Sequence, residues 1–285
     1  MERIPILLDT DIGSDIDDAV ALAYLLCHPR CELLGITTVT GEVEKRAALA
    51  ETVCRAVGRA DIPIHLGRRE PLLDGPGQPR VPQYDEARDR AEAFARPENT
   101  AVHFLRDEIY ARPGEITLLT IGPYSNVALL FALDPAIPKM LKGIVSMGGT
   151  FCGDERAEWN AKVDPTATSM VYRASRPTHL SVGLNVTEQC RMTKDEVGSR
   201  FKGQPLETVR GMAEGWFAHA SHMTFHDPLA AALIFRPELA TYQDGSIESV
   251  DGRTLFTGGE GPDRIAITVD SEAFFEEFFG TIVGP

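Results

Sequence analysis

The sequence predicts an α/β fold in which an open, mostly parallel sheet is flanked by helices on both faces. Short apolar runs alternate along the chain with segments of helical periodicity, which is the pattern of a parallel sheet. The apolar runs lack polar alternation, as expected of strands that helices cover on both sides. The 285 residues, of which 43% are hydrophobic, suffice for one large core. We therefore expect a single domain over residues 1–285.

The first two thirds of the chain contain four predicted strand and helix pairs. The strands are expected at Ile4–Leu8, Leu33–Val39, Ile116–Ile121 and Gly143–Met147. The helices that follow them are expected at Asp17–Cys27, Val43–Val57, Ser125–Leu133 and Asp164–Ala174. A further strand is predicted at His179–Leu184, and the Gly- and Pro-rich segment Gly67–Pro82 is predicted to be a loop.

The last third is predicted to be more helical. Amphipathic patterns predict helices around Leu206–Ala220 and Asp227–Phe235. Asp251-Gly252 predicts a hairpin turn, and Arg264–Val269 predicts a strand. Four aromatic residues at helical spacing predict a helix that docks on the core, with an aromatic oligomer contact as the alternative: Phe274, Phe275, Phe278 and Phe279.

Composition excludes several classes of function. The net charge is −14 and no Lys/Arg-rich run is present, which argues against a nucleic-acid backbone as partner and favours a small or cationic ligand. Five scattered cysteines without CxxC spacing indicate neither a disulfide framework nor a zinc site. The opening residues, MERIPILLDTDIGSD, resemble neither a signal peptide nor a membrane span, so we expect a cytoplasmic protein without membrane partners.

A cluster of carboxylates directly follows the first predicted strand: Asp9, Asp11, Asp15, Asp17 and Asp18. The carboxyl end of a parallel sheet is where open α/β folds bind ligands, so this position favours a functional site. So many carboxylates within one turn repel one another unless a cation binds or their pKa values rise. Helix capping by Asp15 or Asp17 explains one or two of them, but not all five. Oxygen ligands without His or Cys favour Ca²⁺ or Mg²⁺ over zinc.

A strand followed by Asp-x-Asp is also typical of Mg²⁺-dependent phosphatases of the haloacid dehalogenase type. In that alternative Asp9 is the nucleophile, and a lysine such as Lys139 or Lys142 assists. Such a phosphatase also needs a late acidic pair, whereas Asp227 stands alone.

The motifs favour a different family. Asp9–Ala19 at one end and His226-Asp227-Pro228-Leu229-Ala230 near the other resemble the inosine-uridine nucleoside hydrolases. Four further landmarks follow in the expected order, so that the resemblance spans nearly the full length: Leu33–Val39, Ile121–Asn126, Met147–Gly149 and Glu158–Asn160.

The resemblance implies a Rossmann-like nucleoside hydrolase fold and a homodimer or homotetramer. It also implies that Ca²⁺ is bound by Asp11, Asp18, Asp227 and the backbone carbonyl of Ile121. Asp11 would double as general base, and His226 would lie near the leaving base. The implied substrate-binding residues are Asp17, Met147, Glu158 and Asn160.

The chemistry agrees with these roles. A bound cation lowers the pKa of its water, so a neighbouring carboxylate can take the proton near neutral pH. Cleavage of an N-riboside passes through an oxocarbenium-like transition state, whose positive charge Asp and Glu side chains stabilise. Histidine can protonate the departing base. We therefore expect hydrolysis of ribonucleosides to free base and ribose, with a non-catalytic ribose or metal binder as the other alternative.

Three departures from the family pattern concern the sugar site. Asp15 belongs to a two-residue extension, so either Asp15 or Asp17 takes the metal or sugar role, and the Asp-Asp-Ala run favours Asp17. Glu42 occupies the position of a ribose-contacting Asn. The His-Gly segment expected around Gly75–Pro82 is absent, and the loop Phe151–Arg156 is short and lacks an Asn for the 5′-hydroxyl.

Several aromatic and histidine side chains are candidates for contact with the base, although such residues are more often core. Trp159 is the first of these, because it lies between two implied ribose ligands. The others are Tyr84, Trp216, Phe217, His219 and His222, whereas His65, His103 and His179 are expected to be structural.

Overall fold

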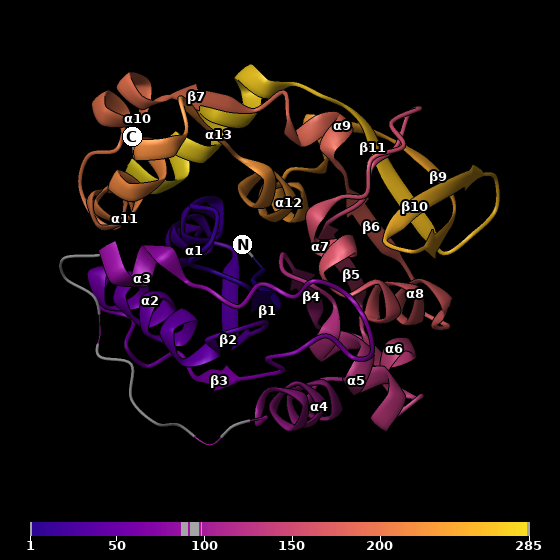
Figure 1. The fold of residues 1–285 in the computed structure, drawn as a ribbon. Helices are drawn as coiled ribbons and strands as arrows, with labels where there is room; N and C mark the ends of the chain where they lie inside the picture. Colours follow the sequence, from indigo (N-terminus) through magenta and orange to yellow (C-terminus); the bar gives the residue numbers. More distant parts are fainter. Residues whose placement is uncertain (1, 87–90, 92–96, 98, 284–285) are drawn as a thin grey trace.

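The fold is built on one nine-stranded sheet. A computed structural model describes residues 2–86, 91, 97 and 99–283. The strand order is β10-β9-β11-β6-β5-β4-β1-β2-β3 (Figure 1). Strands β1 to β6 and β11 pair in parallel, whereas β9 pairs antiparallel with both β10 and β11. The predicted open, mostly parallel sheet is confirmed. The strands of the sheet are β1 (Ile4–Thr10), β2 (Cys31–Thr38), β3 (Ile64–Leu66), β4 (Thr117–Thr120), β5 (Gly143–Met147), β6 (His179–Val182), β9 (Ala240–Val250), β10 (Arg253–Gly258) and β11 (Asp263–Val269).

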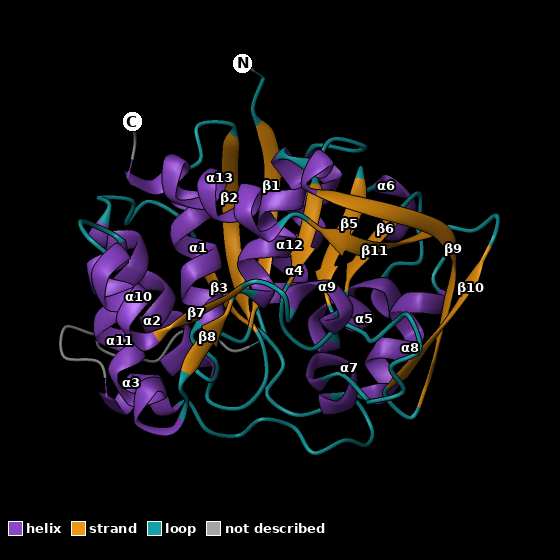
Figure 2. Cartoon of the chain, turned by 90° about the horizontal axis from the view of Figure 1, so that it is seen from above, coloured by secondary structure: helices purple, strands orange, loops and turns teal. Residues whose placement is uncertain are grey.

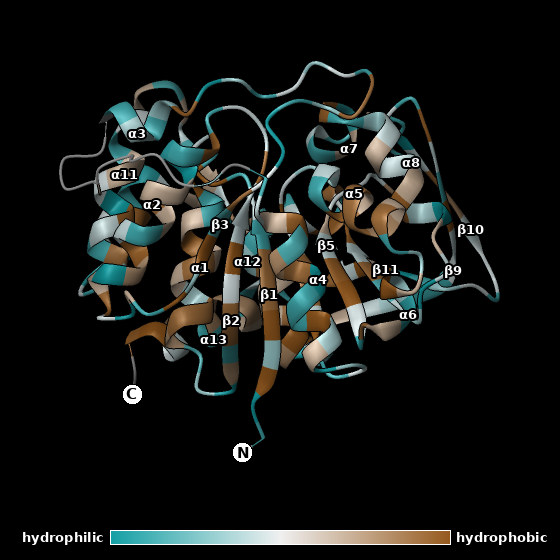
Figure 3. Cartoon of the chain, turned by 90° about the horizontal axis from the view of Figure 1, so that it is seen from below, coloured by the Kyte–Doolittle hydropathy of each residue, from teal (hydrophilic) through white to brown (hydrophobic). Residues whose placement is uncertain are grey.

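Helices cover both faces of the sheet and bury two separate cores. Adjacent side chains of β1 point to opposite faces, so Ile6 and Leu8 belong to one core and Leu7 to the other. In Figure 3 much of β1 and β5 is coloured hydrophobic, as expected of strands buried on both sides. The first core is covered by α1 (Asp17–Cys27), α2 (Val43–Ala56), α11 (Leu206–His219), α12 (His226–Phe235) and α13 (Ser271–Val283). The second is covered by α4 (Ala101–Ala111), α5 (Ser125–Leu133), α6 (Ile137–Met140) and α8 (Pro165–Arg173).

Most predicted elements are found within a few residues of their expected bounds. The Asp251-Gly252 hairpin turn is confirmed, since both residues have positive φ, of 51° and 78°, and join β9 to β10. The docking helix is also confirmed, because Phe274 and Phe278 on α13 are fully buried. The predicted strand His179–Leu184 is too long, since Leu184 already begins α9 (Leu184–Thr187).

Short elements surround the carboxyl ends of the strands. In Figure 2, α3 (Pro82–Glu86) and α7 (Trp159–Val163) lie at the edge opposite the N terminus. A small antiparallel pair, β7 (Arg191–Thr193) and β8 (His222–Thr224), lies with α10 (Lys194–Arg200) beside α11. A 3₁₀ turn at Pro237–Leu239 precedes β9. Within the described ranges, no helix has both the length and the apolar character needed to cross a membrane.

Candidate active site

The loop from β1 to α1 and the first turn of α1 carry the acidic cluster at the carboxyl end of the sheet. Asp11, Asp17 and Asp18 are each at most 5% exposed. The Thr10 hydroxyl donates to Asp18 Oδ1 at 2.5 Å and accepts the Ile12 N–H at 3.1 Å, which fixes the loop against the helix start. The end of β1 thus holds these carboxylates in the interior rather than releasing them to solvent.

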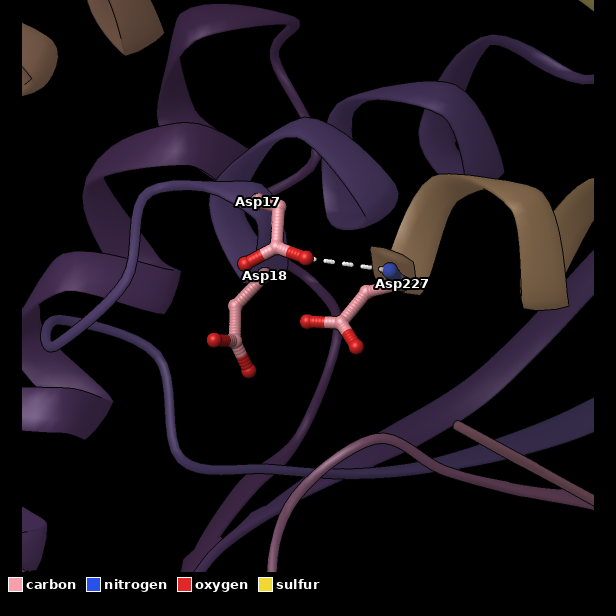
Figure 4. Close-up of side chains that lie close together, drawn as sticks. All are labelled: Asp17, Asp18 and Asp227. Carbon is pink, nitrogen blue, oxygen red and sulfur yellow. Dashed lines mark hydrogen bonds between the residues drawn. The ribbon is translucent and has the colours of Figure 1, made fainter. Parts of the chain in front are cut away.

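Asp227 joins this cluster from the distant helix α12. Its backbone N–H donates to Asp17 Oδ2 at 3.1 Å, so the start of α12 is tied to the start of α1. Figure 4 shows the side chains of Asp17, Asp18 and Asp227 turned toward one another. One carboxylate oxygen from each lies within 4.8 Å of the others. The structure therefore brings together Asp18 and Asp227, two of the predicted metal ligands. The third member of the group is Asp17, which was expected at the sugar, whereas Asp11 is not part of it.

Burial and mutual repulsion raise the pKa values of these three carboxyl groups well above the usual range. Burial is the largest cause for each, and repulsion among the cluster adds to it. Among the described residues none of them forms an ion pair with a Lys or Arg side chain. Buried carboxylates in this state are stabilised by a cation. The donor set of carboxylate oxygens suits a hard divalent ion such as Ca²⁺ or Mg²⁺.

A cleft of about 600 Å³ opens above the cluster. Asp11 and Asp15 line it from the loop, and Ile121, Met147 and Asn160 line it from neighbouring strand ends and α7. Gly122 permits the close approach of the β4 loop, because a Cβ there would lie 2.9 Å from Asp11 Oδ1. The cleft therefore gathers the predicted metal and sugar residues, except Glu42, at adjacent strand ends.

Glu158 is fixed as the N-cap of α7. Its carboxylate accepts N–H groups of Asn160 at 2.8 Å, Ala161 at 3.1 Å and Gly149 at 3.2 Å. Burial nonetheless raises the pKa of Glu158 from 4.5 to about 7. The Asn160 side chain donates to the carbonyls of Ile121, at 2.9 Å, and Met147, at 3.2 Å. Asn160 thus joins two strand ends to α7 while lining the cleft.

His226 lines the cleft with an uncharged ring. Burial lowers the pKa of His226 from 6.5 to about 4. Its Nδ1 lies 2.7 Å from the Thr187 hydroxyl, so the other ring nitrogen is left for the cleft. At neutral pH this side chain is therefore a neutral imidazole, whereas sequence analysis predicted a proton donor titrating near neutrality.

Some predicted residues lie elsewhere. Glu42 does not line the cleft, since its carboxylate pairs with Lys45 Nζ at 2.9 Å where α2 begins. Asp9 is fully buried outside the cleft lining, where Thr37 and Asn126 donate to its carboxylate. Asp9 is thus unsuited to be the nucleophile of the phosphatase alternative.

Of the aromatic and histidine candidates, Trp159 and Trp216 line the cleft, whereas Tyr84, Phe217, His219 and His222 do not.

Asp15 also lines the cleft, but outside the group of three. Its Oδ1 accepts the Ile16 N–H at 2.6 Å, and burial raises the pKa of Asp15 to about 7. The grouping of Asp17 with Asp18 and Asp227 agrees with the preference for Asp17 in the Asp-Asp-Ala run.

Several residues that shape the cleft were not predicted from the sequence. The Gly67–Pro82 loop runs across its mouth, where Gln78 and Arg80 join the lining and the Trp159 indole donates to Gln78 Oε1. Arg46 is a fully buried cation on α2. It lies behind the loop that joins β1 to α1, residues 11–16, which we call the acidic loop. The sequence did contain a sign of this role, because Arg46 is a charged residue on an otherwise apolar face of the predicted helix.

Comparison with known proteins identifies the fold class first. A plant nucleoside hydrolase superposes with a TM-score of 0.85 at 23% identity, with 99% of both chains covered. An inosine-guanosine nucleoside hydrolase gives a TM-score of 0.84 at 22% identity, again over 99% of both chains. These structures share the fold: a mostly parallel sheet flanked by helices.

The family follows from the sequence. A family model described as inosine-uridine preferring nucleoside hydrolase matches residues 6–276. Uridine nucleosidase 1 of Arabidopsis thaliana is 29% identical, over 98% of this chain and 93% of the relative. Non-specific ribonucleoside hydrolase RihC of Shigella boydii serotype 18 is 32% identical, over 90% and 87%. The chain belongs to the inosine-uridine preferring nucleoside hydrolase family and is thus an N-glycosyl hydrolase, as the motifs predicted.

Proposed function

We propose that this protein hydrolyses the N-glycosidic bond of ribonucleosides, releasing free base and ribose, with Ca²⁺ as its metal. The observation that carries the proposal is the convergence of Asp11, Asp17, Asp18, Asp227 and Glu158 on one cleft at the carboxyl ends of the strands. The names of the relatives support a ribonucleoside as substrate. A homodimer or homotetramer and a cytoplasmic location stay predictions from the sequence.

Asp17, Asp18 and Asp227 are the nearest set of oxygen donors for the ion, with Asp11 and the Ile121 carbonyl beside them in the cleft. A Ca²⁺ ion held there would supply the means to orient a water molecule and lower its pKa. Asp11 would accept a proton from the water that attacks C1′. In the metal-free protein burial raises the pKa of Asp11, and the charge of Arg46 opposes this rise.

Glu158 and Asn160 bind the ribose and support the charge that develops on it. The carboxylate of Glu158 is held by three backbone N–H groups, so little reorganisation is needed in the transition state. Asn160 offers its amide oxygen to a hydroxyl, because its amide nitrogen already donates to Ile121 and Met147.

His226 assists the departing base by a hydrogen bond from a neutral ring. If the Thr187 hydroxyl donates to Nδ1, the ring hydrogen resides on Nε2, which faces away from Thr187. Trp159, with 49% of its surface exposed at the cleft mouth, is available for stacking on the base.

The test is a hydrolysis assay on purified protein with Ca²⁺ and a panel of inosine, uridine, adenosine, cytidine and a nitrophenyl riboside. Reducing sugar is measured, with Asp11→Ala and a chelator as controls. Release of ribose that both controls abolish supports the proposal and ranks the bases. Thermal stabilisation by Ca²⁺ and ribose without release of any base would identify a non-catalytic binder instead.

A parallel titration of chelated protein with Ca²⁺ and Mg²⁺ tests the metal. We expect activity to return at lower Ca²⁺ than Mg²⁺ concentration, because Mg²⁺ demands near-octahedral geometry and sheds its water reluctantly. Recovery at lower Mg²⁺ concentration would contradict the assignment of Ca²⁺.

A further inference from the structure

Arg46 is fully buried, yet its guanidinium makes no ion pair within the described part of the chain. It is a donor to backbone and hydroxyl oxygens from three separate segments. Nη1 donates to the carbonyls of Asp11 and Ile12, the latter at 3.1 Å, and to Ser14 Oγ at 3.0 Å; Nε donates to the Thr40 carbonyl at 2.7 Å, and Nη2 to the Gln78 carbonyl at 3.2 Å.

The contacted segments are the acidic loop, the turn after β2 and the loop across the cleft mouth. The turn is strained, because Thr40 has a φ of 64°, a left-handed conformation that a β-branched residue rarely adopts. Thr40 is held there at three points: its N–H donates to the Arg68 carbonyl, its carbonyl accepts from Arg46, and its hydroxyl accepts the Gln78 N–H at 3.1 Å. Strain of this kind persists only where the surroundings enforce it, and it concentrates at functional sites.

Gln78 carries the connection to the far side of the cleft. Its side chain accepts the indole N–H of Trp159, the residue that follows Glu158. One guanidinium therefore fixes the backbone beside Asp11 and also the loop that reaches Trp159.

We propose that Arg46 is a positioning residue that couples the acidic loop to the loop over the cleft, so that metal affinity and substrate affinity both depend on it. The proposal rests on the proposed function. Lysine cannot replace Arg46, because a point charge with three donors lacks the planar fork that reaches all three segments at once.

The experiment compares Arg46→Lys with Arg176→Lys. Arg176 is a matched control, because it is also buried and donates to three carbonyls and to Asp263, but it does not line or adjoin the cleft. Three quantities are measured on each variant: the Ca²⁺ dissociation constant by calorimetry, kcat and KM, and amide hydrogen exchange in the segment around Gln78.

We expect Arg46→Lys to weaken Ca²⁺ binding about 10-fold or more, as is typical when a group that orients metal ligands is lost, and to speed exchange around Gln78. Arg176→Lys should lower the melting temperature but leave Ca²⁺ affinity and KM within about twofold, since distant sites act independently. If Arg46→Lys and Arg176→Lys have the same Ca²⁺ affinity and the same rate of amide exchange around Gln78, the proposal is overturned and Arg46 is merely structural.

A second variant keeps the test decisive if Arg46→Lys does not fold. Thr40→Val removes only the hydroxyl that accepts the Gln78 N–H. The loss of this one hydrogen bond should raise KM about 3- to 10-fold and leave the Ca²⁺ affinity unchanged. An unchanged KM would contradict the coupling. If the wild-type protein releases no base, the proposed function fails, while faster exchange around Gln78 in Arg46→Lys alone still supports the coupling and equal exchange still refutes it.

Discussion

Replacing Glu158 by Gln should make folding stability less sensitive to pH while it removes most activity. Burial raises the pKa of Glu158 from 4.5 to about 7 in the folded protein. The folded state therefore binds the proton more tightly than the unfolded state. The stability that this group contributes is complete below pH 4.5 and is lost as the pH rises toward 7.

The magnitude follows from the two pKa values. One unit of pKa difference corresponds to about 1.4 kcal/mol, so relative to low pH the unfolding free energy of wild type falls by about 1 kcal/mol at pH 5 and by about 3 kcal/mol at pH 8. The difference in unfolding free energy between Glu158→Gln and wild type should thus shift by about 2 kcal/mol in favour of the variant between these pH values. Any constant cost from the amide group facing Gly149 and Ala161 cancels in this comparison.

Urea unfolding of metal-free protein at pH 5, 6, 7 and 8 measures this shift. Glu155→Gln, an exposed neighbour in the sequence, should stay within about 0.5 kcal/mol of wild type at every pH. The kcat of Glu158→Gln should fall about 10²- to 10³-fold, as for other preorganised electrostatic contacts. A difference that does not change with pH would refute the raised pKa of Glu158 on which this prediction rests.

Further variants test the other parts of the cleft. Gly122→Ala should weaken Ca²⁺ binding by about 10-fold, because the new methyl group would lie 2.9 Å from Asp11 Oδ1; unchanged calorimetric affinity would contradict this. Burial lowers the pKa of His226 to about 4, so titration of this ring should not change kcat near pH 6.5. A change of kcat near pH 6.5 that is present in wild type and absent in His226→Ala would show that the ring is charged during turnover. Asp15→Asn should leave Ca²⁺ affinity within about twofold, whereas Asp18→Asn should lose it about 100-fold; similar losses in both would make Asp15 a ligand.

The parts of the structure that depend on local pattern were predictable from sequence. Ile4–Leu8 is apolar throughout, and Gly143–Met147 is apolar except for Ser146. Such runs between helices are typical of buried parallel strands. The aromatic residues of α13 repeat at helical spacing, and Phe274 and Phe278 are fully buried. The position of the acidic cluster followed from the first strand alone, because the carboxyl end of a parallel strand is a fixed place in the fold.

The parts that depend on contacts between distant segments were not predictable. Glu42 was expected in the sugar site, but it lies at the start of α2, where Lys45 follows within one turn and pairs with it. The uncharged state of His226 depends on burial by elements far away in the sequence. The path of the Gly67–Pro82 loop depends on hydrogen bonds to Thr40 and Arg46, and neither partner is visible in the loop's own sequence.

The cleft keeps its negative charge although the cation Arg46 lies nearby. Arg46 lies close enough to lower the pKa values of Asp11 and Asp18, yet its hydrogen bonds go to backbone carbonyls and the Ser14 hydroxyl. An arginine paired with a carboxylate would have occupied the oxygens that a cation and a ribose require. By placing the guanidinium behind the loop, the fold gains rigidity and partial electrostatic compensation while the carboxylate oxygens stay available to ligands. The repulsion that remains favours the binding of a divalent cation and, during the reaction, the positive charge on the sugar.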